Sequence, residues 1–154
     1  MNYKIVELQE KTVVGISAKT NNSSPEMGNV IGSLWEKFYG GVYQQIPHKT
    51  NEFALGIYTD YENDEKGDYT VMTACEVSSA DEDNSLETRK IPAGKYAEFV
   101  IEGDLNTSEQ LAEIGRLWQE IWKLDLNRSY IADFEEYRSA DPNKADIHIF
   151  IGLK

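Results

Sequence analysis

The chain reads FEEY at residues 134–137 and, after a polar loop, IHIFI at residues 147–151. Both stretches have the length and the aromatic or β-branched content that are typical of strands. The loop between them contains DPN at residues 141–143, which is a common turn sequence. We therefore predict a β-hairpin at this end of the chain.

Glu135 is the unusual residue of this hairpin. Because side chains alternate along a strand, Glu135 and Tyr137 point to one face, and Phe134 points into the layer behind the sheet. A carboxylate within an aromatic strand is costly to bury unless water, a partner or a ligand satisfies it. An exposed carboxylate or an internal ion pair would also fit this position. We predict that Glu135 forms the anionic floor of a small-molecule pocket.

Composition limits the classes of function. The chain has 154 residues, enough for one domain, which we place at residues 1–154, and its formal net charge is −12. Lysine and arginine form no cluster of the kind that binds nucleic acid or an anionic membrane, so we expect neither partner. The single cysteine, Cys75, excludes an internal disulfide. No signal peptide and no apolar run of membrane-spanning length are visible, so we expect a cytoplasmic protein.

The sequence indicates neither a metal site nor a cofactor site. His48 and His148 do not form a ligand-spaced cluster with Cys75, which argues against zinc. The acidic runs at residues 60–68 and 81–83 lack the alternation and the closing glutamate of an EF-hand loop. The chain also lacks a glycine-rich phosphate loop and a nucleophile elbow.

An internal repeat organises the whole chain. Residues 31–38 read IGSLWEKF and residues 114–121 read IGRLWQEI, so Ile, Gly, Leu and Trp recur at the same four positions. Both segments have the spacing of an amphipathic helix. After these helices the two copies differ in loop length, and the alignment then sets Tyr58 of the first copy on Glu135 of the second.

The repeat predicts the domain organisation. Each copy reads as strand–helix–strand–strand, with the first copy at residues 1–77, the second at residues 86–154, and a charged connector at residues 78–85. Two such units are expected to pack side by side around a pseudo-twofold axis. Pockets favour interfaces between units of this kind.

Both helices carry end signals. Ser24 as N-cap with Pro25 in the first turn predicts the start of the first helix, and Gly40 with Gly41 predicts its end. Residues 107–110 read TSEQ, which fits a capping box at the start of the second helix.

Five aromatic residues besides Tyr137 are candidates for the pocket wall. Trp35 and Trp118 lie on the apolar stripes of their helices, where a tryptophan is more often part of the core. Tyr39 and Trp122 lie nearer the edges of those stripes and fit a cleft wall better. Tyr58 would face the predicted carboxylate across the cleft, while Tyr137 could hydrogen-bond to it or stack on a ligand.

The sequence resembles a known family. The residues that carry the resemblance are IPAGKYAEF at residues 91–99, the helix around Trp118, and the two strands of the hairpin. In this order they are similar to the GyrI-like small-molecule-binding domain, which is also the effector-binding module of AraC- and MerR-type multidrug regulators. The resemblance implies an α+β fold of duplicated β-α-β-β units, with an antiparallel sheet, two helices and a central ligand cleft. It also implies that Glu135 meets lipophilic, often cationic, aromatic ligands.

Three functions are compatible with this resemblance. The first is a stand-alone effector- or drug-binding protein; because the module spans residues 3–153, control of transcription would act through a protein partner. The second is a small-molecule hydrolase in which Glu135 is the general base and Tyr137 or Tyr58 orients water. The third is a protein-binding inhibitor module. Because the sequence supplies one clear carboxylate and no second catalytic group, we expect binding without turnover.

Overall fold

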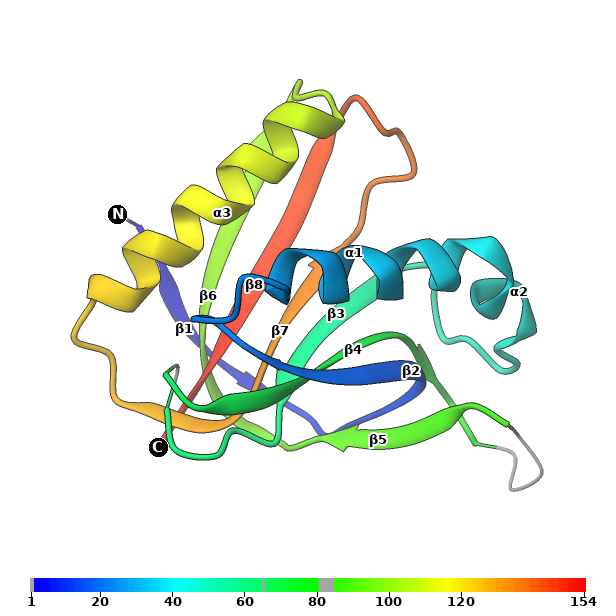
Figure 1. The fold of residues 1–154 in the computed structure, drawn as a ribbon, viewed down its shortest axis with the longest axis horizontal. Helices are drawn as coiled ribbons and strands as arrows, with labels where there is room; N and C mark the ends of the chain where they lie inside the picture. Colours follow the sequence, from blue (N-terminus) through cyan, green and yellow to red (C-terminus); the bar gives the residue numbers. More distant parts are fainter. Residues whose placement is uncertain (1, 65, 81–84) are drawn as a thin grey trace.

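The computed structural model describes residues 2–64, 66–80 and 85–154. Its centre is an eight-stranded sheet in which every neighbouring pair is antiparallel, and two long helices lie in front of it (Figure 1). The predicted α+β fold is therefore confirmed. The elements are β1 (Lys4–Leu8), β2 (Lys11–Asn21), α1 (Met27–Lys37), the π-helical segment η1 (Phe38–Val42), α2 (Tyr43–Gln45), β3 (Ala54–Thr59), β4 (Asp68–Val77), β5 (Glu87–Ile91), β6 (Gly94–Gly103), α3 (Thr107–Lys123), β7 (Arg128–Tyr137) and β8 (Ala145–Leu153).

The strand order shows the internal symmetry of the fold. The sheet runs β1-β6-β8-β7-β3-β4-β2-β5, so β7 and β3 meet at its centre and equivalent strands follow outward on both sides. At this centre Ile57 pairs with Phe134. The sequence alignment that sets Tyr58 on Glu135 also sets Ile57 on Phe134, one position earlier in each copy, as expected where a pseudo-twofold axis passes between paired antiparallel strands.

The two ends of the sheet differ from the simple prediction of two separate units. The first strand of each copy leaves its own copy: β1 pairs with β6, and β5 pairs with β2. The bends at residues 9–10 and 92–93 separate these short strands from β2 and β6. Each copy therefore supplies an edge strand to the other, which links the two copies through backbone hydrogen bonds.

The face of the sheet that points away from the helices carries one apolar cluster. Phe134 is fully buried in it and stacks on Phe150 with ring centroids 4.7 Å apart. Ile91 of the edge strand β5 and Val6 of the edge strand β1 belong to the same cluster. The sheet therefore curls so that its two ends help to bury the same side chains, and Phe134 points into this layer as predicted.

The other face of the sheet is covered by the helices. Leu117 and Ile121 of α3 pack on the isoleucines of β8, while Leu34 of α1 packs on Tyr69 and Val71 of β4. Each helix thus covers one flank, and the middle of the sheet around β3 and β7 faces the space between them (Figure 1). This arrangement leaves alternate residues of β7, including Glu135, facing the helices.

The helix ends were only partly predicted. The helix α3 begins one residue earlier than the TSEQ pattern suggested, since Asn106 is the N-cap and exchanges hydrogen bonds with Glu109 at 3.0 and 3.1 Å. The helix α1 begins at Met27 rather than at Pro25, and the Ser24 hydroxyl accepts a bond from the Glu26 backbone N–H in the preceding turn.

Two further predictions concern connecting segments. Gly41 interrupts the first helical stretch as predicted, since its φ of 164° and ψ of −31° are not helical, and the chain turns there within η1 before the short helix α2. Of the predicted connector at residues 78–85, residues 81–84 lie outside the described residues, as does the acidic run at residues 81–83. In the described part of the chain, no helix has both the length and the apolar character needed to cross a membrane.

Candidate functional site

Glu135 occupies the middle of β7 on the helix side of the sheet. It is paired with Gly56 of β3, and only 2% of its surface is exposed. A Cβ atom at Gly56 would lie 3.0 Å from Glu135 Oε1 and 3.2 Å from Trp35 Cζ2. Gly56 therefore provides the space that the carboxylate and the Trp35 ring occupy.

Three uncharged donors hold this carboxylate. Trp118 Nε1 donates to Oε2 at 2.6 Å, the Tyr137 hydroxyl donates to Oε1 at 2.7 Å, and the Tyr58 hydroxyl donates to Oε1 at 3.3 Å. Burial raises the pKa of Glu135, and these three bonds oppose that rise. Burial and the Glu135 charge also raise the pKa of Tyr58 and Tyr137 well above the usual range, so both phenols stay protonated and can donate.

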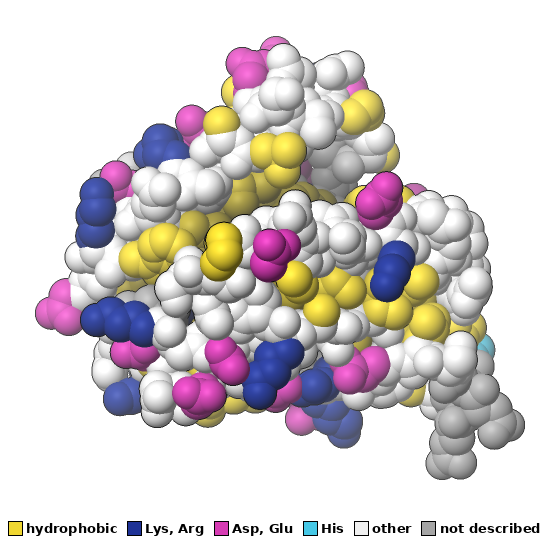
Figure 2. All heavy atoms as spheres, viewed as in Figure 1, with side chains coloured by type: hydrophobic (Ala, Val, Ile, Leu, Met, Phe, Trp, Pro, Cys, Tyr) yellow, Lys and Arg dark blue, Asp and Glu magenta, His cyan; other side chains and the backbone are white. Residues whose placement is uncertain are grey.

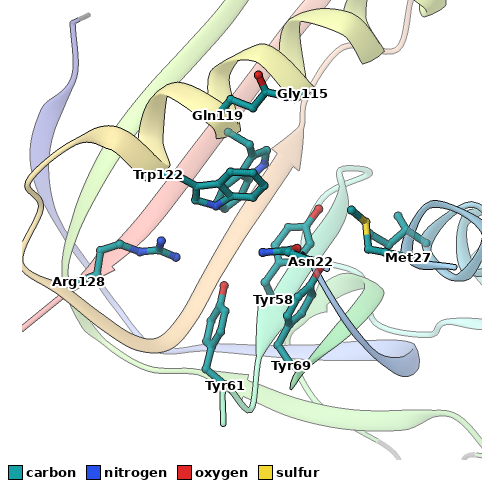
Figure 3. Close-up of a pocket in the computed structure, with 11 residues that line it drawn as sticks. Asn22, Met27, Tyr58, Tyr61, Tyr69, Gly115, Gln119, Trp122 and Arg128 are labelled. Atoms are coloured by element: carbon teal, nitrogen blue, oxygen red, sulfur yellow. Dashed lines mark hydrogen bonds between the residues drawn. The ribbon is translucent and has the colours of Figure 1, made fainter. Parts of the chain in front are cut away.

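A cavity of about 250 Å³ lies in front of this group, between the sheet and the two helices. Tyr58, Tyr61 and Tyr69 rise from the sheet side toward Trp122 of α3, and Arg128 reaches in from one end (Figure 3). Figure 2 shows hydrophobic side chains at the bottom of the hollow between α3 and α1. The residues that line the cavity are Asn22, Met27, Ile31, Tyr58, Tyr61, Tyr69, Gly115, Trp118, Gln119, Trp122 and Arg128.

An aromatic layer separates the carboxylate from the cavity. Tyr58 and Trp118 line the cavity, yet their polar atoms turn back to Glu135. Their rings meet edge-to-face with centroids 5.2 Å apart. A molecule in the cavity therefore contacts the Tyr58 and Trp118 rings first and experiences the Glu135 charge through them.

The other predicted site residues lie at different depths. Trp122 is 40% exposed and lines the cavity, and Tyr137 lies behind the cavity beside the carboxylate. Trp35 packs edge-to-face on Tyr137 with centroids 5.4 Å apart, one layer further back. Tyr39 is 59% exposed and stacks on Trp35, outside the cavity lining.

Several lining residues were not predicted from the sequence. Tyr61 and Tyr69 flank the acidic loop after β3. The internal repeat does not align them with candidate site residues of the second copy, so it did not identify them as candidates. Gly115 did carry a signal, since it repeats Gly32 in the aligned helices. The other lining residues missed by sequence reasoning are Asn22, Met27, Ile31, Gln119 and Arg128.

A second buried carboxylate, Asp133, lies two residues from Glu135 on the same strand face. It is fully buried and accepts from Arg128 Nη2 at 2.8 Å, from the Tyr61 hydroxyl at 2.6 Å and from the Gly152 backbone N–H at 2.8 Å. Burial raises the pKa of Asp133, and the Arg128 charge opposes this rise. Asp133 thus has a cationic partner, whereas the donors on Glu135 are uncharged.

The described residues contain no group of three or more His, Cys, Asp or Glu side chains that could hold a metal ion. Cys75 is fully buried, and burial raises the pKa of its thiol to about 11. The chemistry that this site offers is therefore that of a carboxylate, phenols, indoles and one guanidinium.

Comparison with known proteins gives the family. The family model described as integron-associated effector binding protein matches residues 4–153. A comparison with curated protein sequences finds no significant match.

Solved structures share the whole fold. The chain is similar to an integron cassette protein from the mobile metagenome of Vibrio cholerae, with 28% identity and a TM-score of 0.77 over 99% of this chain and 95% of that one. It is similar to SAV2435, solved with tetraphenylphosphonium bound, with 20% identity and a TM-score of 0.79 over 100% and 94% of the two chains. The C-terminal domain of EcmrR has 16% identity and a TM-score of 0.56 over 100% and 99%. Together with the family match, these likenesses confirm the GyrI-like resemblance.

Proposed function

The chain belongs to the family of integron-associated effector binding proteins, and from this premise we propose that it binds lipophilic aromatic molecules, with a preference for cations. The cavity beside Tyr58 and Trp118 is the proposed site, and Glu135 is the proposed counter-charge. The observation that carries the proposal is the burial of Glu135 among three uncharged donors. A bound cation would supply the opposite charge that these donors do not.

The expected energetics favour a delocalised cation. A unit charge roughly 6 Å from the carboxylate gains about 3 kcal/mol at an effective dielectric constant of about 20. Aromatic faces such as those of Tyr58, Tyr69 and Trp122 add cation–π attraction of about 0.5–2 kcal/mol each. Because Tyr58 and Trp118 donate to an anion, their rings are also polarised towards greater electron density. SAV2435, which shares this fold, binds tetraphenylphosphonium, a cation of the same kind.

The geometry supports binding rather than turnover. A general base needs a water molecule within hydrogen-bond reach. Both oxygens of Glu135 accept hydrogen bonds from protein groups, and the Tyr58 and Trp118 rings lie between it and the cavity. We therefore propose a role in effector sensing or sequestration. A link to transcription would act through a partner protein, since a net charge of −12 disfavours direct contact with DNA.

Tetraphenylphosphonium is expected to stabilise the protein against heat. Ligand at a hundred times its dissociation constant adds about 2.7 kcal/mol to the free energy of unfolding. For a chain of this size that corresponds to an increase in Tm of about 5–10 °C. Thermal-shift measurements with tetraphenylphosphonium and with neutral triphenylphosphine oxide test the proposal. Equal shifts with both compounds would contradict the preference for cations, and no shift with either would contradict the proposed site.

Binding of the cation is also expected to release protons over a limited pH range. Burial raises the pKa of Glu135 in the free protein, and a bound cation lowers it again by favouring the carboxylate. Between these two pKa values the free protein holds more protons than the complex, so affinity increases with pH across this range and is constant above it. Calorimetry in two buffers of different ionisation enthalpy measures the number of protons released.

The control for this experiment is the Glu135→Gln variant. Burial also raises the pKa of Asp133, so a second carboxyl group could contribute to the signal. Proton release should disappear in Glu135→Gln and persist in wild type. Release of the same size in both proteins would assign the linkage to another group.

A further inference from the structure

Arg128 places a positive charge at the wall of a cavity proposed to attract cations. We infer that the cavity has two poles and takes amphoteric aromatic molecules, with a cationic group over the Tyr58–Trp118 layer and a carboxylate against Arg128. This inference rests on the proposed function and adds a second recognition element to the same site. Its basis is the way in which the fold directs Arg128, the orientation of the Arg128–Asp133 pair, and the spacing along β7.

The backbone of β7 is distorted in a way that directs Arg128 to the site. Residues five apart on a regular strand point to opposite faces, yet Arg128 and Asp133 contact each other. The register of β7 on β8 shifts between these two residues, and Tyr130 between them has a φ of 54°. A left-handed conformation is unfavourable for an aromatic residue, and such distortions are concentrated at functional sites.

The ion pair presents its positive end to the cavity. Asp133 is fully buried behind the lining, while the guanidinium of Arg128 is part of the lining and points into the cavity (Figure 3). The guanidinium also lies 4.4 Å from the centroid of the Tyr130 ring, which fixes its plane. Well-packed apolar residues often replace a buried ion pair without loss of stability, so stability alone is a weak reason for this pair. Recognition of an anionic group is a sufficient reason, because a guanidinium matches the geometry of a carboxylate.

The spacing of the two poles suits a ligand with one aromatic ring between its charged groups. Asp133, which holds Arg128, and Glu135 are two residues apart on one strand, which corresponds to about 7 Å. A single aromatic ring with its charged groups at opposite ends spans such a distance. The cavity of about 250 Å³ has room for a molecule of this size. The amide groups of Asn22 and Gln119 in the lining add further polar contacts at this site.

A pair of matched probes tests the inference. The zwitterion 4-[(trimethylammonio)methyl]benzoate and the corresponding benzamide share the ammonium group, the ring and the shape, and differ in the negative charge. We expect NMR titration to show that wild type binds the benzoate about tenfold more tightly than the benzamide. The double variant Arg128→Met, Asp133→Asn removes both charges of the buried pair and should abolish this preference. Arg128→Lys keeps the positive charge but lacks the planar guanidinium, so it should retain only part of the preference for the benzoate.

The Glu135→Gln variant separates the inference from the proposed function. Both probes carry the same ammonium group, so this variant should weaken both by a similar factor and leave their ratio unchanged. The inference would be overturned if wild type bound the two probes equally, or if the preference for the benzoate survived the double variant. In either case, binding of tetraphenylphosphonium would still support the proposed function. Failure of both probes to bind would also overturn it. If tetraphenylphosphonium also failed to bind, the proposed function would be rejected.

Discussion

Replacing Glu135 with glutamine is expected to weaken the binding of tetraphenylphosphonium by about 100-fold. The carboxylate is the buried charge nearest to the aromatic layer, and a cation roughly 6 Å away loses about 3 kcal/mol of attraction at an effective dielectric constant of about 20. Glutamine preserves the shape of the side chain and an oxygen that can accept from Tyr137. The change removes the charge together with the acceptor of the Trp118 N–H, because the glutamine NH2 group can only donate. Comparison with a neutral ligand separates the two effects, and isothermal titration calorimetry measures the affinities.

The chain offers a matched control for this prediction. Glu136 is the next residue, is 6% exposed, and pairs with Arg138 at 2.6 Å on the other face of the strand. Glu136→Gln changes the net charge of the protein by the same amount and should leave the affinity for tetraphenylphosphonium nearly unchanged. Neutral triphenylphosphine oxide should bind both variants as it binds wild type. If Glu135→Gln weakened the neutral compound as much as the cation, the role of Glu135 as counter-charge would be wrong.

The sequence was informative where the physical signal is local or repeated. Strand alternation placed Glu135 and Phe134 on opposite faces of β7, because an apolar layer requires a regular period of two. The repeat predicted that Ile57 and Phe134 are equivalent, and they pair at the centre of the sheet. It also set Tyr58 opposite Glu135 across a cleft, but the structure places the two on neighbouring strands of the same sheet face, where the Tyr58 hydroxyl lies 3.3 Å from the carboxylate. Their role in ligand binding stays a prediction.

Features that depend on non-local pairing could not be predicted in this way. The pairing of β1 with β6 joins segments about ninety residues apart, and neither segment contains a local signal that names its partner. Arg128 lies before a distortion of β7, and counting positions along a regular strand would have placed it on the wrong face. Tyr61 and Tyr69 line the cavity from the two sides of the acidic loop between β3 and β4, and neither was marked as a site residue by the repeat. The sequence therefore indicated the centre of the candidate site better than its rim.

Replacing Asp133 with alanine is expected to lower the free energy of unfolding by about 3–5 kcal/mol. The variant leaves the Arg128 charge buried without its carboxylate partner, and it removes the acceptor of the Tyr61 hydroxyl and the Gly152 backbone N–H. Because a domain of this size is stabilised by only about 5–15 kcal/mol, a loss of this size should be clear in urea denaturation. Glu136→Ala is the control, and it should cost about 1 kcal/mol or less because its partner Arg138 is 32% exposed.

The double variant Arg128→Met, Asp133→Asn should be more stable than Asp133→Ala, although it changes two buried residues. It removes the guanidinium charge along with the carboxylate that opposes it, and it keeps an oxygen at position 133 for the two remaining donors. A coupling free energy between the two positions of about 2 kcal/mol or more is expected from the complete double-mutant cycle. Additive losses would show that Arg128 and Asp133 stabilise the fold independently. The double variant would then be a poor means of removing the positive pole of the cavity, and the comparison of benzoate with benzamide would depend on Arg128→Lys.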